Sequence, residues 1–191
     1  IELGLVGSEM CIRDSAATLD GLGAAVAITV TDSSISAADL DAVNQLSTAT
    51  ITSTATEITG NAHQLEDALL RNVNKKFTDN DRDAFAAATN EVITGLDAVN
   101  VRATAALTPA EINFLEDYTT GTITATVDGA SAAALLGASD KIDTLSRVHN
   151  LTITVTDTTI TAANIAALNA ATSGTVNINS SILQGTSSQV L

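Results

Sequence analysis

Apolar and polar residues alternate along several short stretches of the chain, in which Ile, Val or Leu alternates mainly with Thr. Examples are Ile28-Thr29-Val30-Thr31, Thr50-Ile51-Thr52-Ser53-Thr54 and Ile153-Thr154-Val155-Thr156. This period of two is typical of a half-buried β-strand, whose successive side chains point to opposite faces of a sheet. We therefore expect strands with an apolar inner face and a Thr-rich outer face.

A different spacing follows these stretches and predicts helices. Apolar residues recur three to five positions apart, as at Ile35, Leu40 and Val43 in one segment and at Ile160, Ile165 and Leu168 in another. Such spacing places them on one face of a helix. A hydroxyl residue with a polar residue three positions later opens each segment: Ser36 with Asp39, Thr108 with Glu111, Thr161 with Asn164. This is the pattern of a helix N-cap, whose oxygen accepts from a backbone N–H of the first turn.

The strand–helix pattern repeats along the chain. Residues 28–38 recur without a gap as residues 153–163, and residues 107–112 resemble residues 160–165. Internal periods of 20–50 residues are typical of solenoids and related repeat architectures. Predicted strands start near Val26, Ala49, Asn72, Val99, Gly121, Leu151 and Gly174, with Val73–Phe77 as the third strand. The corresponding repeats span residues 26–48, 49–71, 72–98, 99–120, 121–150, 151–173 and 174–191.

Successive strand–helix–strand units predict parallel strands joined by right-handed crossovers. A doubly wound sheet would have strands that are apolar on both faces, and a closed barrel would need a packed interior. A Thr-rich outer face fits neither. We predict an α/β fold: an open solenoid of about seven strand–helix repeats, with a parallel sheet and the helices on one face. Tandem Ig-like sandwiches are the alternative, and they would need strands where the helix patterns stand.

The first fifteen residues differ from the rest of the chain. The segment Ser8–Ser15 holds the only Met and the only Cys and resembles the translated read-through of a sequencing adaptor. A genuine N-terminal strand and turn is the alternative. We treat residues 1–15 as an artefact or a tail, and residues 16–191 as one repeat domain. Because the chain begins at Ile1 and ends at Leu191 within a repeat, we expect it to be a fragment.

Composition excludes several classes of protein. The chain has 22 acidic and 8 basic residues and a net charge of −14, so we expect no nucleic-acid partner. No apolar run approaches the roughly 18 residues of a membrane span, so we expect no membrane insertion. A single cysteine, Cys11, excludes an intrachain disulfide and a multi-Cys zinc site. His63 and His149 lack partners at ligand spacing, and no nucleophile elbow or phosphate loop occurs, so we do not expect an enzyme.

One segment resembles half of a Ca²⁺ site. The alternating carboxylates of Asp79, Asp81 and Asp83 could converge on Ca²⁺ as in the first half of an EF-hand loop. The match then fails, because Ala84 stands where the loop needs Gly and Asn90 where it needs Glu. The alternative, which we favour, is that these acids complement the positive N-terminus of a helix. We expect no cofactor, with Ca²⁺ as the one candidate.

The Thr-rich outer face is the candidate binding face. Neighbouring strands lie about 4.8 Å apart and alternate residues about 6.6 Å apart, and regular Thr rows at these spacings resemble the flat faces of ice-binding solenoids. The alternative is that Thr is simply the polar residue best suited to strands; Asn100 and Arg102 interrupt the rows. The candidate face consists of Thr29, Thr31, Thr50, Thr52, Thr122, Thr124, Thr154 and Thr156.

The repeats resemble those of the Ala/Thr/Asp-rich tandem-repeat exoproteins of bacteria, which are often adhesin-like. The motifs that carry the resemblance are Val30-Thr31-Asp32, Ile35–Leu40, Ile58–Ala62 and Thr120–Ile123. It covers residues 26–191, with residues 72–98 the poorest fit, and implies a large, secreted, repetitive protein of the bacterial surface.

We therefore expect an extracellular structural or spacer module, whose partners are the neighbouring repeats of the same chain. The alternative is a binding or adhesion module that uses the Thr-rich face to bind a glycan, a surface or ice.

Overall fold

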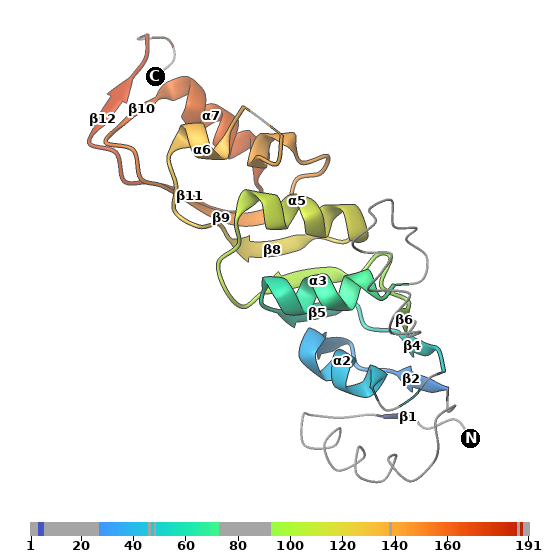
Figure 1. The fold of residues 1–191 in the computed structure, drawn as a ribbon. Coiled ribbons are helices and arrows are strands. Elements are labelled where there is room, and N and C mark those ends of the chain that lie inside the picture. Colours follow the sequence, from blue (N-terminus) through green and yellow to red (C-terminus); the bar gives the residue numbers. More distant parts are fainter. Residues whose placement is uncertain are drawn as a thin grey trace. The chain divides into compact units, whose positions relative to one another are not determined.

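The computed structural model describes residues 4–5, 27–45, 47, 49–72, 93–137, 139–186 and 188. These residues belong to two compact units. Unit 1 is Ile1–Arg102 with Tyr118–Gly121, and unit 2 is Ala103–Asp117 with Thr122–Leu191. Both units combine short parallel strands with short helices (Figure 1). The predicted α/β class is confirmed.

Unit 1 has two sets of parallel strands. The first sheet has the order β1 (Gly4–Leu5), β2 (Ile28–Val30), β4 (Ile51–Ser53) and β6 (Ile93–Thr94). In the second, β3 (Ser34–Ser36), β5 (Glu57–Gly60) and β7 (Asn100–Ala103) are successive neighbours. The helices α2 (Ala37–Asn44) and α3 (Ala62–Leu70) follow β3 and β5 and pack against each other. One repeat is therefore two short strands followed by a helix.

The first two repeats of unit 1 pair with a register of 23 residues. Ile28 lies opposite Ile51, and Ile35 lies opposite Ile58. Identical spacing in both sheets means that these two repeats pair residue for residue.

Unit 2 repeats the same pattern. The strands β8 (Ile123–Thr126), β9 (Asn150–Val155) and β11 (Val176–Ile178) are successive neighbours, and β10 (Thr159–Thr161) pairs with β12 (Ile182–Gln184). The helices are α5 (Pro109–Tyr118), α6 (Ala132–Leu135), the 3₁₀ helix η1 (Ile142–Thr144) and α7 (Ala162–Ala171). Register is again 23 residues from Ile160 to Leu183. It is 26 residues from Ala125 to Leu151, because α6 and η1 lengthen that connection.

The predicted helix starts are confirmed by their capping hydrogen bonds. Ser36 Oγ accepts from Asp39 N–H at 3.0 Å and donates to the Asp39 carboxylate at 2.6 Å. Thr161 Oγ1 accepts from Asn164 N–H at 3.1 Å. Thr108 and Glu111 bond reciprocally, with Thr108 N–H donating to Glu111 Oε2 at 2.7 Å and Glu111 N–H to Thr108 Oγ1 at 3.3 Å. Each cap satisfies backbone donors that a helix start leaves unpaired.

The assignment of Ile35 and Ile160 to helices is wrong. They lie in β3 and β10, where Ile35 pairs with Ile58 and Ile160 with Leu183. The helices begin only after the capping residues Ser36 and Thr161, because an N-cap residue itself has extended backbone. The isoleucine before the cap is thus free to join a strand, and each repeat gains a second strand.

The predicted third strand, Val73–Phe77, lies outside the described residues. The strand that pairs with β4 is instead β6: Ile51 lies opposite Ile93 and Thr52 opposite Thr94. Asn72 also forms an isolated parallel bridge with Ile93. The neighbour of β4 is thus 42 residues further along the chain, not 23.

The alternation of inner and outer residues is confirmed in strands β4 and β9. In β9 the side chains of Leu151, Ile153 and Val155 are completely buried, while Thr152 and Thr154 are half-buried. In β4, Ile51 is buried and Thr52 exposed. The core is consequently built from Ile, Val, Leu and Ala side chains.

We predict that Ile153→Asp destabilises unit 2 by about 4 kcal/mol or more, because it places an unpaired carboxylate at a fully buried position. Urea unfolding followed by far-UV circular dichroism measures this change. Thr154→Ser on the outer face should change the free energy of unfolding by less than about 0.5 kcal/mol. Equal losses in the two variants would contradict the inner and outer assignment of β9.

Candidate functional site

In unit 1 the candidate Thr face forms one regular row. Thr29 lies opposite Thr52, and Thr52 lies opposite Thr94, on the three strands β2, β4 and β6. The Thr94 hydroxyl lies 3.4 Å from that of Thr52. Thr31 and Thr50 are exposed just outside the ends of β2 and β4. The structure therefore brings three hydroxyl side chains into line, and Thr94 is a member that the sequence had not indicated.

In unit 2 the corresponding rows contain Asn as well as Thr. Thr124 lies opposite Asn150, and Thr154 lies opposite Asn177. Thr122 precedes β8 and Thr156 follows β9, and both are exposed. The register between β8 and β9, in which Thr124 and Asn150 are 26 residues apart, is one reason why the Thr residues are out of line. The candidate residues of unit 2 share a face but do not form an unbroken Thr row.

Many hydroxyl groups beside these strands bond to the backbone of the preceding repeat. In unit 1 the bonds are Thr54 Oγ1 to Val30 O at 3.2 Å, Thr56 Oγ1 to Ser33 O at 2.9 Å, Thr94 Oγ1 to Ile51 O at 3.2 Å and Thr120 Oγ1 to Asp97 O at 3.0 Å. In unit 2 they are Ser173 Oγ to His149 O at 3.1 Å, Ser180 Oγ to Asp157 O at 2.6 Å and Ser181 Oγ to Thr158 O at 3.2 Å. These hydroxyls join one repeat to the next. The recurrence of Ser and Thr at the repeat spacing is the sequence signal that could have revealed this role.

Two further threonines bury their hydroxyls between repeats. Thr172 Oγ1 accepts from the N–H groups of Leu151 at 2.8 Å and Gly174 at 2.9 Å, and lies 2.9 Å from Leu151 O. In unit 1, Thr119 Oγ1 donates to Val99 O at 2.6 Å and accepts from Gly121 N–H at 3.0 Å. Both side chains satisfy buried backbone groups, which are costly to leave unpaired.

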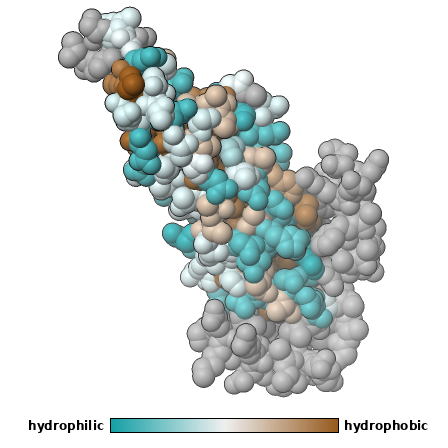
Figure 2. Space-filling view, turned by 60° about the vertical axis from the view of Figure 1, so that its left-hand side comes forward, coloured by the Kyte–Doolittle hydropathy of each residue, from teal (hydrophilic) through white to brown (hydrophobic). Residues whose placement is uncertain are grey.

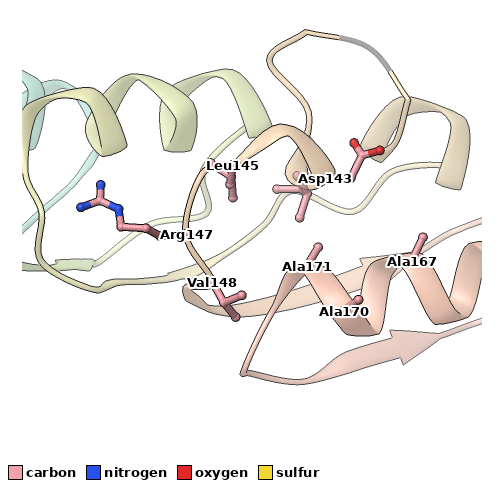
Figure 3. A pocket seen from close by; sticks show the side chains of 8 residues that line it. Asp143, Leu145, Arg147, Val148, Ala167, Ala170 and Ala171 are labelled. Carbon is pink, nitrogen blue, oxygen red and sulfur yellow. The ribbon is translucent and has the colours of Figure 1, made fainter.

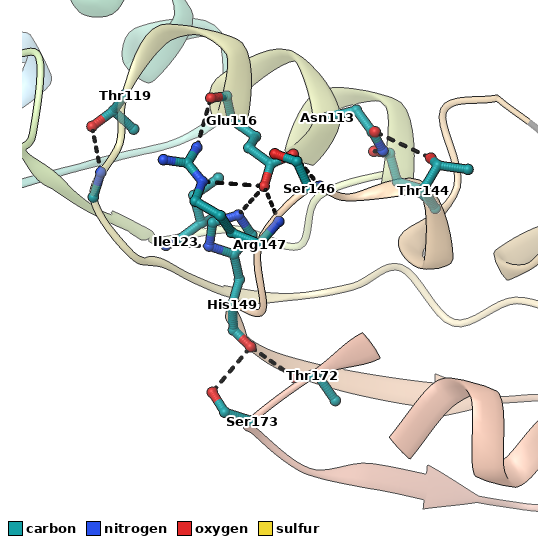
Figure 4. Close-up of polar contacts among 12 residues, drawn as sticks. Asn113, Glu116, Thr119, Ile123, Thr144, Ser146, Arg147, His149, Thr172 and Ser173 are labelled. Atoms are coloured by element: carbon teal, nitrogen blue, oxygen red, sulfur yellow. Dashed lines mark hydrogen bonds and ion pairs between the residues drawn. The ribbon is translucent and has the colours of Figure 1, made fainter. Parts of the chain in front are cut away.

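A buried cluster of charged and polar side chains fixes the loop before β9 to α5 (Figure 4). Glu116 on α5 accepts from the backbone N–H groups of Ser146 at 2.9 Å and Arg147 at 2.8 Å. The Arg147 guanidinium donates to the Glu116 backbone carbonyl at 2.8 Å. His149 Nε2 lies 3.0 Å from Glu116 Oε1. Sequence reasoning missed this cluster, because Glu116 and His149 are 33 residues apart and no local pattern links them.

The hydrogen bonds of His149 determine its tautomer. Its Nδ1 accepts from the backbone N–H of Ile123 at 3.1 Å, so the proton lies on Nε2, which donates to Glu116. Burial lowers the pKa of His149, although the Glu116 carboxylate opposes this shift. Burial alone would raise the pKa of Glu116, but the bonds from Ser146, Arg147 and His149 outweigh it and lower that pKa. Near neutral pH the cluster therefore holds a neutral imidazole and an ionised carboxylate.

The Glu116–His149 cluster is suited to stabilising the fold rather than to catalysis. The side chain of His149 is 1% exposed and that of Glu116 is 7% exposed, so neither offers a group to a reactant from solvent. Both ring nitrogens of His149 and both carboxylate oxygens of Glu116 have partners within unit 2.

A pocket of about 270 Å³ lies beside α7 in unit 2 (Figure 3). Its walls include Ala167, Ala170 and Ala171 of α7 and Val148 of the loop before β9. The Asp143 carboxylate, which also lines it, accepts from Gly137 N–H at 3.0 Å. The pocket is thus a mainly apolar hollow whose lining residues include no nucleophile with an adjacent base.

The Ca²⁺ candidate Asp79, Asp81 and Asp83 lies outside the described residues. In the part of the chain that the structure describes, no group of three or more His, Cys, Asp or Glu side chains is placed to hold a metal ion. Within the same residues, no helix has the length and the apolar character needed to cross a membrane.

Comparison with known proteins identifies no relative: the chain matches no protein-family model, no curated protein and no solved structure. Function is therefore inferred from the described geometry together with the sequence repeat.

We predict that Thr172→Val lowers the free energy of unfolding by about 2–4 kcal/mol. The shape is retained, but the buried N–H groups of Leu151 and Gly174 lose their acceptor, at a cost of about 1–3 kcal/mol each. The matched control is Thr126→Val at an exposed position of β8, which should change stability by less than about 0.5 kcal/mol. Urea unfolding measures both; similar losses would show that the hydroxyl of Thr172 is not what stabilises the turn.

We predict that His149 makes unit 2 less stable as the pH falls below about 6.5. The unfolded imidazole, with a pKa near 6.5, takes up a proton that the folded one resists because its pKa is lowered. Stability is then lost by at most about 1.4 kcal/mol per pH unit. Below pH 4.5 protonation of Glu116, whose folded pKa is also lowered, adds to the loss.

The measurement is the free energy of unfolding at pH 7.5, 6.5, 5.5 and 5.0. His149→Gln should remove most of the slope between pH 6.5 and 5.0, whatever its stability at pH 7.5. His63→Gln, which removes an imidazole that is 85% exposed, is the control and should keep the slope of the original chain. An unchanged slope in His149→Gln would contradict the prediction.

Proposed function

We propose that this chain is a structural or spacer repeat module of a large secreted bacterial surface protein. In this proposal it acts outside the cell as an open solenoid of about seven repeats, its partners are the neighbouring repeats of the same chain, and it is not an enzyme. The observation that supports it best is the use of the hydroxyl groups. They donate to backbone carbonyls one repeat away, as from Thr56 to Ser33 and from Ser181 to Thr158.

Hydrogen bonds of this kind suit a spacer. Each repeat contacts mainly its neighbours, so stability is added repeat by repeat, and an array can be extended without a new core. A backbone carbonyl is an acceptor that every repeat presents, whatever its side chains. Part of the Thr and Ser content of the chain thus serves internal bonding, without a ligand.

The charge of the chain also suits a long array. A net charge of −14 keeps copies and neighbouring arrays apart in solution and limits non-specific association. The buried ionisable groups of unit 2, Glu116 and His149, bond to each other and to the backbone, which favours a structural role for them.

The second candidate function is a binding or adhesion module. The observation that favours it is the row Thr29, Thr52 and Thr94 on three successive strands of unit 1. Such a row presents hydroxyl groups at strand spacing, about 4.8 Å, to a glycan, a surface or ice.

The two candidates predict different results for a chain displayed on bacterial cells with a peptide tag at its tip. For a spacer, capture of the cells by antibody-coated beads rises when two chains are joined in tandem, and Thr52→Lys leaves capture unchanged. For an adhesion module, the purified chain binds glycan arrays, cells or ice saturably, and Thr52→Lys abolishes that binding while Thr126→Lys in unit 2 does not. Saturable binding lost in Thr52→Lys would overturn the spacer proposal.

A further inference from the structure

The pocket beside α7 lies where unit 2 has a short helix. The helices α5 and α7 each have 10 residues, whereas α6, which stands between them in the chain, has four and is followed by the three-residue η1. Where α7 packs against η1 it presents alanines, which fill little of the space that the short helix leaves. The result is a hollow of about 270 Å³ between α7, η1 and the loop before β9 (Figure 3).

The walls of the pocket are held in place by buried neighbours. Ile142 of η1 lines the pocket and is 1% exposed, and Leu168, next to Ala167 on α7, is completely buried. The lining alanines of α7 share one helix face, because they lie three or four positions apart. The loop before β9 is fixed to α5 by two backbone N–H bonds to Glu116. The hollow is therefore formed before any ligand arrives.

The size and the lining of the pocket fit a small apolar group. An engineered cavity of about 150 Å³ in a protein core holds one benzene molecule, so about 270 Å³ accommodates a phenyl ring with a short alkyl chain. Six of the eight lining residues have purely aliphatic side chains: Ile142, Leu145, Val148, Ala167, Ala170 and Ala171.

The surrounding surface favours a small molecule over a protein partner. On the face seen in Figure 2, polar and weakly hydrophobic side chains are mixed, and strongly hydrophobic atoms occupy a few separate areas. Of the three large apolar side chains that the described residues expose, only Val148 lines the pocket. A standard protein interface uses roughly 20–30 residues on each partner, whereas eight residues line this hollow.

The charges at the pocket favour a ligand with a cationic end. Asp143 and Arg147 are the two charged lining residues. The Arg147 guanidinium is directed away from α7 (Figure 3) and bonds to the backbone carbonyl and the carboxylate of Glu116. The exposed Asp143 carboxylate accepts from the N–H of Gly137, although a carboxylate has about four acceptor sites. It can therefore also pair with an ammonium group, and the net charge of −14 attracts cations to the chain.

We propose that this pocket binds a small organic cation, in which an aryl or alkyl group ends in an ammonium group. The apolar part occupies the hollow between α7 and η1, and the ammonium group pairs with the Asp143 carboxylate at its rim. Because few atoms are buried and the hollow is open to water, we expect a dissociation constant of about 1 mM for a ligand of about ten heavy atoms. The inference does not depend on the proposed spacer function.

The test is methyl NMR of the full chain titrated with 3-phenylpropylammonium, with 3-phenylpropanol and 3-phenylpropionate as the neutral and anionic counterparts. We expect saturable shifts of methyl groups that line the pocket, such as those of Val148 and Ala170, and none of Leu40 in unit 1. The ammonium should bind about two- to fivefold more tightly than the alcohol, as an exposed ion pair allows, and the carboxylate should bind most weakly.

Two variants with matched controls locate the site. Ala170→Leu should raise the dissociation constant at least about fivefold, because the added carbon atoms occupy the hollow. Ala166→Leu makes the same change at an exposed position of α7 that does not line the pocket, and it should leave the constant unchanged. Asp143→Asn should remove the preference for the ammonium over the alcohol, whereas Asp128→Asn, at an exposed position away from the lining, should keep it.

Several results would overturn the inference. Shifts that stay linear in probe concentration, or that spread over both units, would mean non-specific attraction to an acidic chain. An unchanged constant in Ala170→Leu would exclude the pocket, and equal affinity for the three probes would exclude a cation as the ligand. Urea unfolding of each variant shows whether the fold is kept. Asp143→Asn alters an acceptor of Gly137 N–H, whereas Ala170→Leu changes an exposed residue, so the second variant keeps the test valid if the first destabilises η1.

Discussion

The close approach of successive repeats at the turn before a strand is the constraint on which the rest of the structure depends. A Cβ atom on Gly121 would lie 2.1 Å from Val99 O, and one on Gly174 would lie 2.4 Å from Leu151 O. Only glycine fits so near a neighbouring carbonyl. Two residues earlier, Thr119 and Thr172 supply the hydroxyls that satisfy the backbone there. The register of the strands, and with it the burial of every second residue, follows from this packing.

The Glu116–His149 pair also satisfies a backbone N–H group between neighbouring strands, at the longer connection between β8 and β9. Leu151 N–H is satisfied by the hydroxyl of Thr172, and Ile123 N–H by the imidazole of His149. An imidazole can accept from the backbone only in one tautomer, and the carboxylate of Glu116 fixes that tautomer. Glu116 and His149, which have no nearby partners in the sequence, thus hydrogen-bond the backbone of a neighbouring repeat as the threonine hydroxyls do elsewhere.

The features that could be predicted from the sequence are those with a local signal. Alternation placed Ile153 inside and Thr154 outside, and the hydroxyl-to-acid spacing located the start of α2 at Ser36. The pattern assigns Ile35 to the helix although it lies in β3, because one apolar residue between two hydroxyls fits a strand and the start of a helix equally well. The bonds of Thr172 and the pairing of β4 with β6 depend on residues 21 and 42 positions away. Only the fold brings such residues together.

Because the hydrogen bonds between repeats end on backbone carbonyls, they tolerate substitution of the side chains around them. A carbonyl oxygen is present at every residue, so a hydroxyl such as that of Thr56 or Ser181 finds its acceptor even when the facing side chain has been substituted. Recombination that duplicates, deletes or exchanges a 23-residue segment therefore preserves the joints on both sides of it. We expect substitutions to cost most at the glycine turns, at the buried aliphatic positions and at the buried polar bonds of Thr172 and the Glu116–His149 pair.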